Sequence, residues 1–307
     1  MYYTSAKPCS YSSTSIQDQN MASKAPRSSP LLPWEALAAS WDEGMGDEGN
    51  QYFSVLELPV LKRLVNICPE ARALDLATGN GLVARWLAQE GASVLATDGS
   101  EAMLDRARAR TAIWYERGQL PEGKIAFDIL DVTDNEAWKK KIFSHPDMNQ
   151  GFDVITMNMA LMDIPDLEPL AAGLPKILRK NGCFVATLLH PIFFTSGADR
   201  QLTVHENPRT GKREFDLAIV MRKYLDVPPA RQLPFTENTE SPPPFSFHRP
   251  LHDLFAPFFK NGLVLDALEE TNFDETFQDS SRPHAARNFT QFPKILAFRM
   301  RQGNQNE

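Results

Sequence analysis

The sequence predicts an α/β protein with a doubly wound, mostly parallel sheet of seven strands. Short apolar runs alternate with amphipathic segments from Trp34 to Arg301, and two of these runs lead into acidic residues and glycines. Such runs are typical of buried parallel strands, and the helical segments between them supply the crossover connections. The expected strands cover residues 72–77, 93–98, 125–130, 152–157, 183–189, 264–268 and 294–300.

Helical spacing of apolar residues fills the intervals between these strands. In the segment 80–90, Leu82, Val83, Trp86 and Leu87 share one face, and a glycine follows the last turn. Ser100 stands where the next helix begins, and its hydroxyl suits an N-cap. The expected helices cover residues 34–41, 52–67, 80–90, 100–110, 135–143, 167–178 and 251–260.

Changes in composition divide the chain into segments. Residues 1–33 are rich in Ser, Thr and Pro, so we expect a disordered tail, with an organellar transit peptide as the alternative. The folded domain is expected over 34–301, with a second disordered tail at 302–307. Residues 191–250 contain many prolines and aromatic residues. We expect this insertion after the fifth strand to form a partly ordered cap over the substrate.

Composition also narrows the class of function. There are 32 Lys and Arg against 39 Asp and Glu, a formal net charge of −7, which disfavours a nucleic-acid partner because phosphates need a basic face. No apolar run approaches the ~20 residues of a membrane-spanning helix, so we expect no membrane association. Cys9, Cys68 and Cys183 lack CxxC spacing and suit reduced thiols. We therefore expect a cytoplasmic enzyme or binding protein, and the sequence leaves its oligomeric state open.

The strongest chemical signal is the segment LDLATGNG, which runs from Leu74 to Gly81. A strand, a glycine turn and a helix follow one another, so the backbone can approach a ligand at a helix N-terminus. Asp98 ends the next expected strand, 17 residues after Gly81, where its carboxylate can accept both hydroxyls of a ribose. This acid makes the site more specific than the glycines alone would.

A dinucleotide site is the competing interpretation of this turn. Residues 79–84 fit the GxGxxA pattern, so a nicotinamide-dependent oxidoreductase is an alternative. Asp75 disfavours it, because a carboxylate before the glycines repels a pyrophosphate but attracts a cationic sulfonium or amino group. Met103 is placed to cover an adenine face, and Asp131, after the third strand, can accept a hydrogen bond from an adenine amino group.

Together these motifs resemble the class I S-adenosylmethionine-dependent methyltransferases of the small-molecule, specialised-metabolite type. The resemblance extends over nearly all of 34–301 and implies a Rossmann-like sheet, S-adenosylmethionine as cofactor and a small-molecule substrate. Ala77 replaces the usual first glycine of the turn, and we expect tighter packing there rather than lost binding. The cofactor-binding residues that the resemblance implies are Asp75, Ala77, Gly79, Gly81, Asp98, Gly99, Met103, Asp131, Val132, Asn158 and Met159.

The acceptor side is less specific in the sequence. Residues 41–52, WDEGMGDEGNQY, resemble the flap that closes over cofactor and acceptor in related methyltransferases, with an ordinary helix–helix loop as the alternative. His190, at the end of the fifth strand, and His248, before the last helix, are candidate general bases, and each has a structural role as its alternative. The candidate acceptor-site residues are Trp41, Met45 and Tyr52 of the flap, and Tyr224 and Arg249 of the insertion.

Methyl transfer from a sulfonium requires mainly that the nucleophile is aligned and water excluded, so proximity supplies much of the acceleration. No Asp/Asp/Asn metal cluster is evident in the sequence, and we expect a metal-independent transfer to an O or N atom. A noncatalytic S-adenosylmethionine-binding regulator and a protein or RNA methyltransferase are further alternatives. The acidic charge disfavours RNA.

Overall fold

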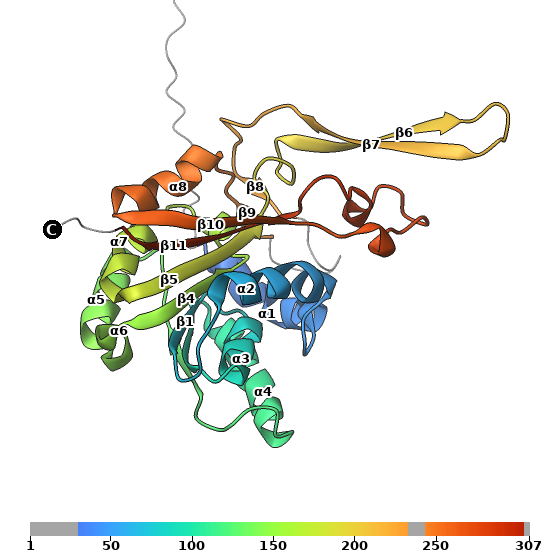
Figure 1. Ribbon diagram of the computed structural model, residues 1–307. Helices are drawn as coiled ribbons and strands as arrows, with labels where there is room; N and C mark the ends of the chain where they lie inside the picture. Colours follow the sequence, from blue (N-terminus) through green and yellow to red (C-terminus); the bar gives the residue numbers. More distant parts are fainter. Residues whose placement is uncertain (1–29, 233–242, 304–307) are drawn as a thin grey trace, which may run out of the picture.

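The structure, a computed structural model, describes residues 30–232 and 243–303, so most of the expected N-terminal tail and residues 304–307 lie outside the described residues. A sheet of seven strands in the order β10-β11-β5-β4-β1-β2-β3 forms the centre of the molecule (Figure 1). Its strands are β1 (Arg72–Leu76), β2 (Ser93–Asp98), β3 (Ile125–Ile129), β4 (Phe152–Asn158), β5 (Leu178–Leu189), β10 (Leu263–Thr271) and β11 (Ile295–Gln302). All neighbours pair in parallel except β11, which is antiparallel to both β5 and β10. The predicted fold class is confirmed.

Helices cover both faces of the sheet because adjacent strand residues point to opposite sides. Ala73 packs in a core cluster with residues of α2 and α3, whereas Leu74 packs in a second cluster with residues of α5, α7 and α8. The α-helices are α1 (Leu32–Met45), α2 (Leu58–Val65), α3 (Leu82–Gln89), α4 (Glu101–Glu116), α5 (Asn135–Ser144), α6 (Pro146–Gln150), α7 (Glu168–Ile177) and α8 (Leu251–Lys260). Within 30–232 and 243–303, no helix has the length and apolar character needed to span a bilayer.

The parallel register brings the ends of β1, β2 and β4 to one edge of the sheet. Asp75 on β1 pairs with Ala96 on β2 and with Thr156 on β4. The next residues along each strand lead to the glycine turn, Asp98 and Asn158 respectively, which therefore lie next to one another. This edge is where open α/β sheets bind ligands.

Two ends of the folded region differ from their predicted positions. The first helix begins at Leu32 rather than at residue 34, and a proline occupies its first turn, where no backbone donor is needed. The last strand continues to Gln302, where the sequence predicted a tail, because its Cα pairing with Leu263 extends β11 by two residues.

The helix expected over 52–67 is divided in two. Tyr52–Glu57 forms a π-helical turn, η1, and α2 follows directly. Pro59 lacks an N–H and cannot donate to the carbonyl of Val55, so the regular α-helical ladder is interrupted at this point. Asn66, in the left-handed conformation, ends α2.

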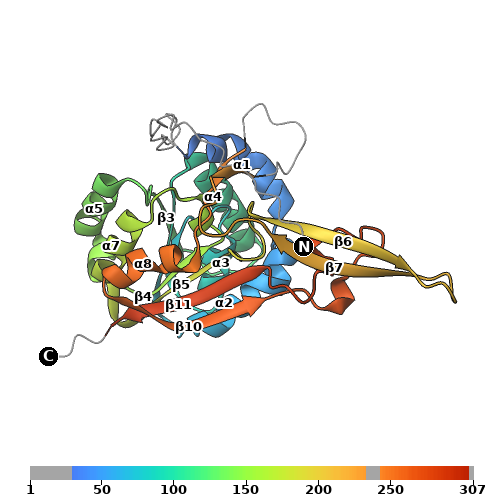
Figure 2. The same ribbon diagram turned by 90° about the horizontal axis from the view of Figure 1, so that it is seen from above.

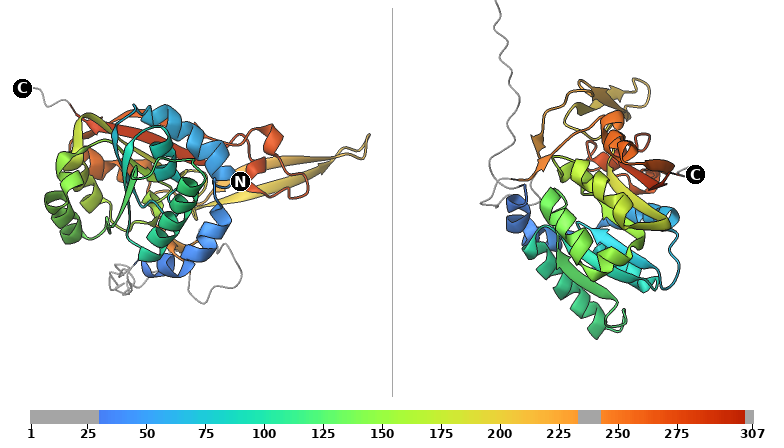
Figure 3. Two further views of the ribbon diagram at one scale, coloured as in Figure 1. Left: turned by 90° about the horizontal axis from the view of Figure 1, so that it is seen from below. Right: turned by 90° about the vertical axis from the view of Figure 1, so that its left-hand side faces the viewer.

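The insertion after β5, predicted to form a cap, contains a long hairpin. Its strands β6 (Ala198–Glu206) and β7 (Arg213–Met221) pair over nine residues each and project away from the central sheet (Figures 1 and 2, and Figure 3, left). A second small pair joins β8 (Ala230–Arg231) to β9 (Phe245–Ser246). These strands were not predicted, because the insertion was recognised by its many prolines, which disfavour regular strands.

Replacing Gly173 on α7 tests the packing of the helices on one face. A Cβ at this position would lie 1.6 Å from Nε1 of the buried Trp138 on α5, so Gly173→Ala requires the two helices to separate. We expect this substitution to lower the free energy of unfolding by ~1–3 kcal/mol, as overpacking does, measured by urea denaturation. The control is Ala172→Ser at the adjacent, partly exposed position, and an unchanged Gly173→Ala protein would contradict this account of α5–α7 packing.

Candidate active site

The turn after β1 has a left-handed backbone at three positions. Ala77, Gly79 and Gly81 have φ of 51°, 57° and 83°, a region that costs a non-glycine residue roughly 1–2 kcal/mol. The N–H of Thr78 donates to the carbonyl of Thr97 on β2 (2.9 Å), and Gly81 N–H donates to Thr78 O (2.9 Å). The turn is therefore held tightly against the end of β2, with its alanine in a strained conformation.

Asp98 joins the turn to the following helix. Its Oδ2 accepts the N–H of Gly79 (2.9 Å) and its Oδ1 accepts the N–H of Ser100 (2.9 Å). Burial raises the pKa of Asp98 to about 6, and these two donors only partly oppose the rise. Each carboxylate oxygen keeps a second lone pair, so the group can still accept two hydroxyls.

Asp75 is held by a side-chain donor on each of its two oxygens. Thr78 Oγ1 donates to its Oδ2 (2.6 Å), and Thr156 Oγ1 donates to its Oδ1 (2.7 Å). Burial raises the pKa of Asp75 to about 6, and the nearby charge of Asp98 contributes to the rise. The residue thus combines an anchored position with a charge that a cationic ligand would stabilise.

A cavity of about 120 Å³, here called the strand-end cavity, lies where β1, β2, β3 and β4 end. Asp131 is fixed at its rim, because its Oδ1 accepts both the N–H (2.8 Å) and the hydroxyl (2.7 Å) of Thr133. The predicted site residues that line this cavity are Trp41, Ala77, Gly79, Asp98, Gly99, Met103, Asp131, Val132, Asn158 and Met159. The structure therefore brings ten of them together.

A second cavity of about 280 Å³, here called the flap cavity, adjoins the first. The two share Trp34, Trp41, Ala77, Gly79, Asn158, Met159 and Asp163, so they are parts of one depression. The predicted flap residues Trp41, Met45 and Tyr52 line the flap cavity together with Asp75.

One carboxylate fastens the flap to the core. Asp42 on α1 accepts hydrogen bonds from Arg110 Nε (2.9 Å) and Nη2 (3.1 Å) and from Asn80 Nδ2 (3.0 Å). Burial opposes ionisation, but these donors and the charge of Arg110 lower the pKa of Asp42. Trp34 packs edge-on against Trp41, with their ring centroids 5.5 Å apart. Both indole rings belong to α1 and line the cavities.

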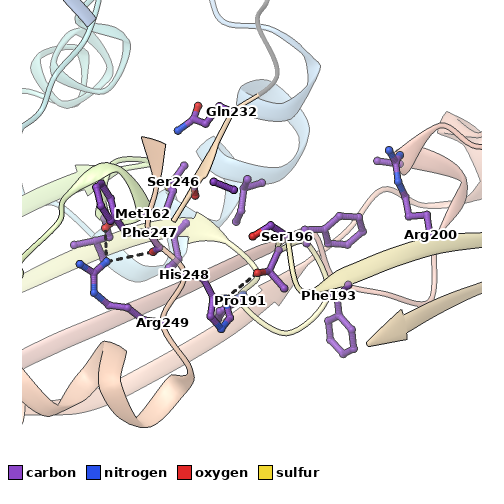
Figure 4. Close-up of a pocket in the computed structure, with 18 of the residues that line it drawn as sticks. Met162, Pro191, Phe193, Ser196, Arg200, Gln232, Ser246, Phe247, His248 and Arg249 are labelled. Carbon is purple, nitrogen blue, oxygen red and sulfur yellow. Dashed lines mark hydrogen bonds between the residues drawn. The ribbon is translucent and has the colours of Figure 1, made fainter. Parts of the chain in front are cut away.

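A third and larger cavity of about 740 Å³, the cap cavity, lies under the insertion (Figure 4). The predicted residues Tyr52, His248 and Arg249 line it. His248 Nε2 donates to the carbonyl of Tyr224 (2.7 Å), which leaves Nδ1 to accept from the hydroxyl of Thr195 (2.9 Å). Burial lowers the pKa of His248, so the ring is neutral with both nitrogens engaged.

The side chain of Arg249 is likewise held by hydrogen bonds within the protein. Its guanidinium donates to the carbonyls of Leu161 (3.3 Å), Phe247 (3.4 Å) and Ile164 (2.5 Å). These bonds join the last part of the insertion to the loop after β4, and Figure 4 shows Arg249 beside His248 on the same wall.

Three predicted site residues line none of these three cavities: His190, Tyr224 and Gly81. His190 is 1% exposed, its Nε2 lies 2.7 Å from Oε1 of Glu270 on β10, and its Nδ1 accepts the N–H of Ile192 (3.2 Å). The imidazole turns toward β10, which favours the structural role that was the alternative to a general base. The phenol of Tyr224 accepts the N–H of Leu251 (2.9 Å), and Gly81 serves as the N-cap of α3.

Several lining residues were not predicted. Trp34, Asp163 and Gln232 line the flap cavity, and Leu31 lines the strand-end cavity although it was assigned to the tail. Glu57 also lines the flap cavity and is 4% exposed. A sequence signal for Glu57 existed, because it follows Phe53 by four residues and precedes Leu61 by four, on the apolar face of the predicted helix.

Within the described parts of the chain, no group of three or more His, Cys, Asp or Glu side chains is placed to hold a metal ion.

Residues 74–184 match the family described as Methyltransferase domain. The chain is also similar to the ubiquinone biosynthesis O-methyltransferases of Pasteurella multocida (26% identity over 155 residues) and Histophilus somni (25% over 164 residues). The matches cover 50% and 53% of this chain, and they span only 60% and 64% of those relatives.

Solved structures share the fold. An S-adenosylmethionine-dependent methyltransferase from Mesorhizobium loti superposes with a TM-score of 0.57 and 23% identity, covering 84% of this chain and 100% of that one. The CcbJ methyltransferase from Streptomyces caelestis gives a TM-score of 0.54 and 16% identity, covering 90% and 100%. Residues 74–184 are thus similar to a methyltransferase domain, and the sheet around them has the fold of S-adenosylmethionine-dependent methyltransferases.

Proposed function

We propose that the chain transfers a methyl group from S-adenosylmethionine to an O or N atom of a small molecule. The observation that carries the proposal is the continuity of three cavities. The strand-end cavity adjoins the flap cavity, which shares Tyr52, Met162, Leu189 and Gln232 with the cap cavity. Cofactor and acceptor thus have connected spaces that meet at the ends of β4 and β5.

The residues present fit the cofactor. S-adenosylmethionine supplies an activated methyl group on a cationic sulfonium. Asp98, with free lone pairs on a buried carboxylate, suits the ribose hydroxyls, and Met103 and Val132 line the same cavity as apolar surfaces for the adenine. Asp75 in the flap cavity suits the cationic end of the ligand.

The cap cavity suits a partly apolar acceptor. Phe193, Phe194 and Phe247 line it, and Arg200 offers a cation at its margin (Figure 4). The names of the two curated relatives favour a hydroxyl acceptor, since both are O-methyltransferases of ubiquinone biosynthesis. A role in specialised metabolism, a cytoplasmic location and a metal-independent reaction remain parts of this proposal.

In this proposal the chain contributes mainly alignment and exclusion of water. Tyr52, Trp41 and Met45 of the flap cover the methyl-transfer space, and His248 orients the cap through Thr195 and Tyr224 rather than acting as a base. A noncatalytic cofactor-binding regulator would have the same cofactor cavities, and turnover of an acceptor separates the two functions.

Asp98→Ala tests the cofactor site. Loss of the carboxylate removes the acceptors for the ribose and the bond to Gly79, so we expect ~10–100-fold weaker binding of S-adenosylmethionine, as for hydrogen bonds to a charged group. Isothermal titration calorimetry measures the change. Asp105→Asn, an exposed carboxylate on the helix α4 that follows Asp98, is the matched control, and equal affinity of a folded Asp98→Ala protein would exclude Asp98 from the site.

Cofactor affinity should depend on pH. Burial raises the pKa values of Asp75 and Asp98 to about 6, so both carboxyls are protonated at lower pH. A cationic ligand favours the ionised forms, and affinity should therefore rise between about pH 5 and 7 and then level off. Titrations at several pH values test this rise, which should shrink in Asp98→Asn. A flat profile in the native protein would contradict it.

An acceptor screen tests the activity itself. We expect methyl-labelled S-adenosylmethionine to give a product heavier by one labelled methyl group with at least one member of a panel of phenols, catechols and amines, detected by mass spectrometry. Deletion of residues 30–52 should abolish the product, because these residues supply the flap. Cofactor binding without turnover across the panel would favour the regulator.

A further inference from the structure

Glu57 is a buried carboxyl to which the proposed methyl transfer assigns no role. It is the last residue of the π-helical turn η1, is 4% exposed, and lines the flap cavity together with Asp75, Thr78 and Tyr52. A carboxyl is rarely buried without a compensating role, because its charged form is costly to desolvate. π-helical turns within helices occur often at functional sites.

A hydrogen-bond chain orients Glu57 from the tips of two strands. The Thr187 hydroxyl on β5 donates to Oδ1 of Asn158 (2.6 Å), and Asn158 Nδ2 donates to Oε2 of Glu57 (2.8 Å). The direction is fixed, since Thr187 Oγ1 also accepts the N–H of Met159 (3.1 Å). Within 30–232 and 243–303, Asn158 is the only hydrogen-bond partner of Glu57, so Oε1 retains its full capacity as an acceptor.

The other candidate bases near the cavities are already engaged. Both oxygens of Asp75 accept threonine hydroxyls, and Asp163 accepts a hydrogen bond from Gln232. Both ring nitrogens of His190 and of His248 have partners. Among the described residues, Glu57 and Asp163 are therefore the carboxyls of the flap cavity with one oxygen bound and the other open, and of the two it is Glu57 that is held from the tips of β4 and β5.

The titratable groups facing Glu57 within the flap cavity are Tyr52, Asp75 and Asp163. Burial raises the pKa of each, so none supplies a cation, and burial likewise raises the pKa of Glu57 to about 7. Proton uptake near neutral pH is what a general base requires.

The charged residues of α2 and of the strands next to it form ion pairs outside the flap cavity. Arg63 on α2 pairs with Glu269 on β10 (2.6 Å), and Arg299 on β11 pairs with Asp266 (2.8 Å). These residues do not line the flap cavity. No lysine or arginine lines this cavity either, so among the described residues Glu57 lacks a basic partner there.

We infer that Glu57 is the general base of this protein, which removes the proton from an O–H or N–H acceptor that extends from the cap cavity into the adjoining flap cavity. The inference rests on the proposed function. As the acceptor's O or N atom bonds to the methyl carbon, the carbon–sulfur bond breaks and its electron pair remains on sulfur. The acceptor's proton moves to the Glu57 carboxylate and later passes to water. The substrates are thereby restricted to protic acceptors.

A binding experiment tests the location of Glu57 without an acceptor. S-adenosylmethionine and S-adenosylhomocysteine differ by the methyl group and the positive charge on sulfur, so their affinity ratio isolates the sulfonium. We expect the affinity for S-adenosylmethionine relative to S-adenosylhomocysteine to rise on the order of tenfold from pH 6 to pH 8, because Glu57 ionises over this range. This rise should be smaller in Glu57→Gln. Glu116→Gln, an exposed glutamate at the end of α4 that lines none of the three cavities, should behave as the native protein.

The outcomes separate the inference from the proposed function. If neither ligand binds the native protein, the methyltransferase function fails. If both bind and the pH dependence of their ratio is the same in the native protein and in Glu57→Gln, the function stands and the inference is overturned. S-adenosylhomocysteine binding by Glu57→Gln also shows that the variant is folded.

Turnover of an acceptor found by the screen tests the role of the group. At saturating cofactor, Glu57→Gln should lower kcat ~10²–10⁴-fold with little change in the acceptor's KM, and Glu57→Asp should restore part of the rate. The native rate should rise with pH to a plateau, and this inflection should be absent from Glu57→Gln. A native pH profile in Glu57→Gln would show a structural role only and overturn the inference.

Discussion

The site depends on one hydrogen bond, between the N–H of Gly79 and the carboxylate of Asp98. It connects the end of β1 to the end of β2 and fixes a turn that the backbone alone would not favour, since Ala77 is left-handed. The carboxylate is buried and its pKa is raised, so it remains a strong acceptor for any further donor that enters. Parallel pairing of β1 with β2 and β4 brings the remaining groups to the same edge.

Around this edge the chain builds an inner layer of strand ends and an outer layer of connecting segments. The strand ends and their helices are buried and closely hydrogen-bonded, as at Asp75 with its two threonines. The segments predicted as flap and cap are attached by side chains such as Asp42 and Asp47 of the first and Arg249 of the second. In the proposed function, cofactor recognition belongs to the inner layer and acceptor recognition to the connecting segments, as is common where loops carry specificity on a fixed scaffold.

The sequence predicted the sheet well because buried parallel strands and glycine turns leave local patterns. Asp98, Met103 and Val132 could be assigned from their positions at strand ends, and they do line one cavity. The direction of the His190 side chain could not be predicted, because it depends on Glu270, which is 80 residues away in the chain. The β6–β7 hairpin was missed although apolar residues recur at every second position from Phe215 to Met221, because the prolines of the insertion outweighed this alternation.

The clasp at Asp42 has a consequence for the timing of each cycle. Trp34 and Trp41 of α1 form a wall shared by the two inner cavities, and Asp42 on the same helix is bound by Arg110 and Asn80. For a nucleoside cofactor bound as proposed, outward movement of α1 would require the ion pair of Asp42 with Arg110 to break. The clasp would then lengthen the residence time of the spent nucleoside without touching the reacting atoms.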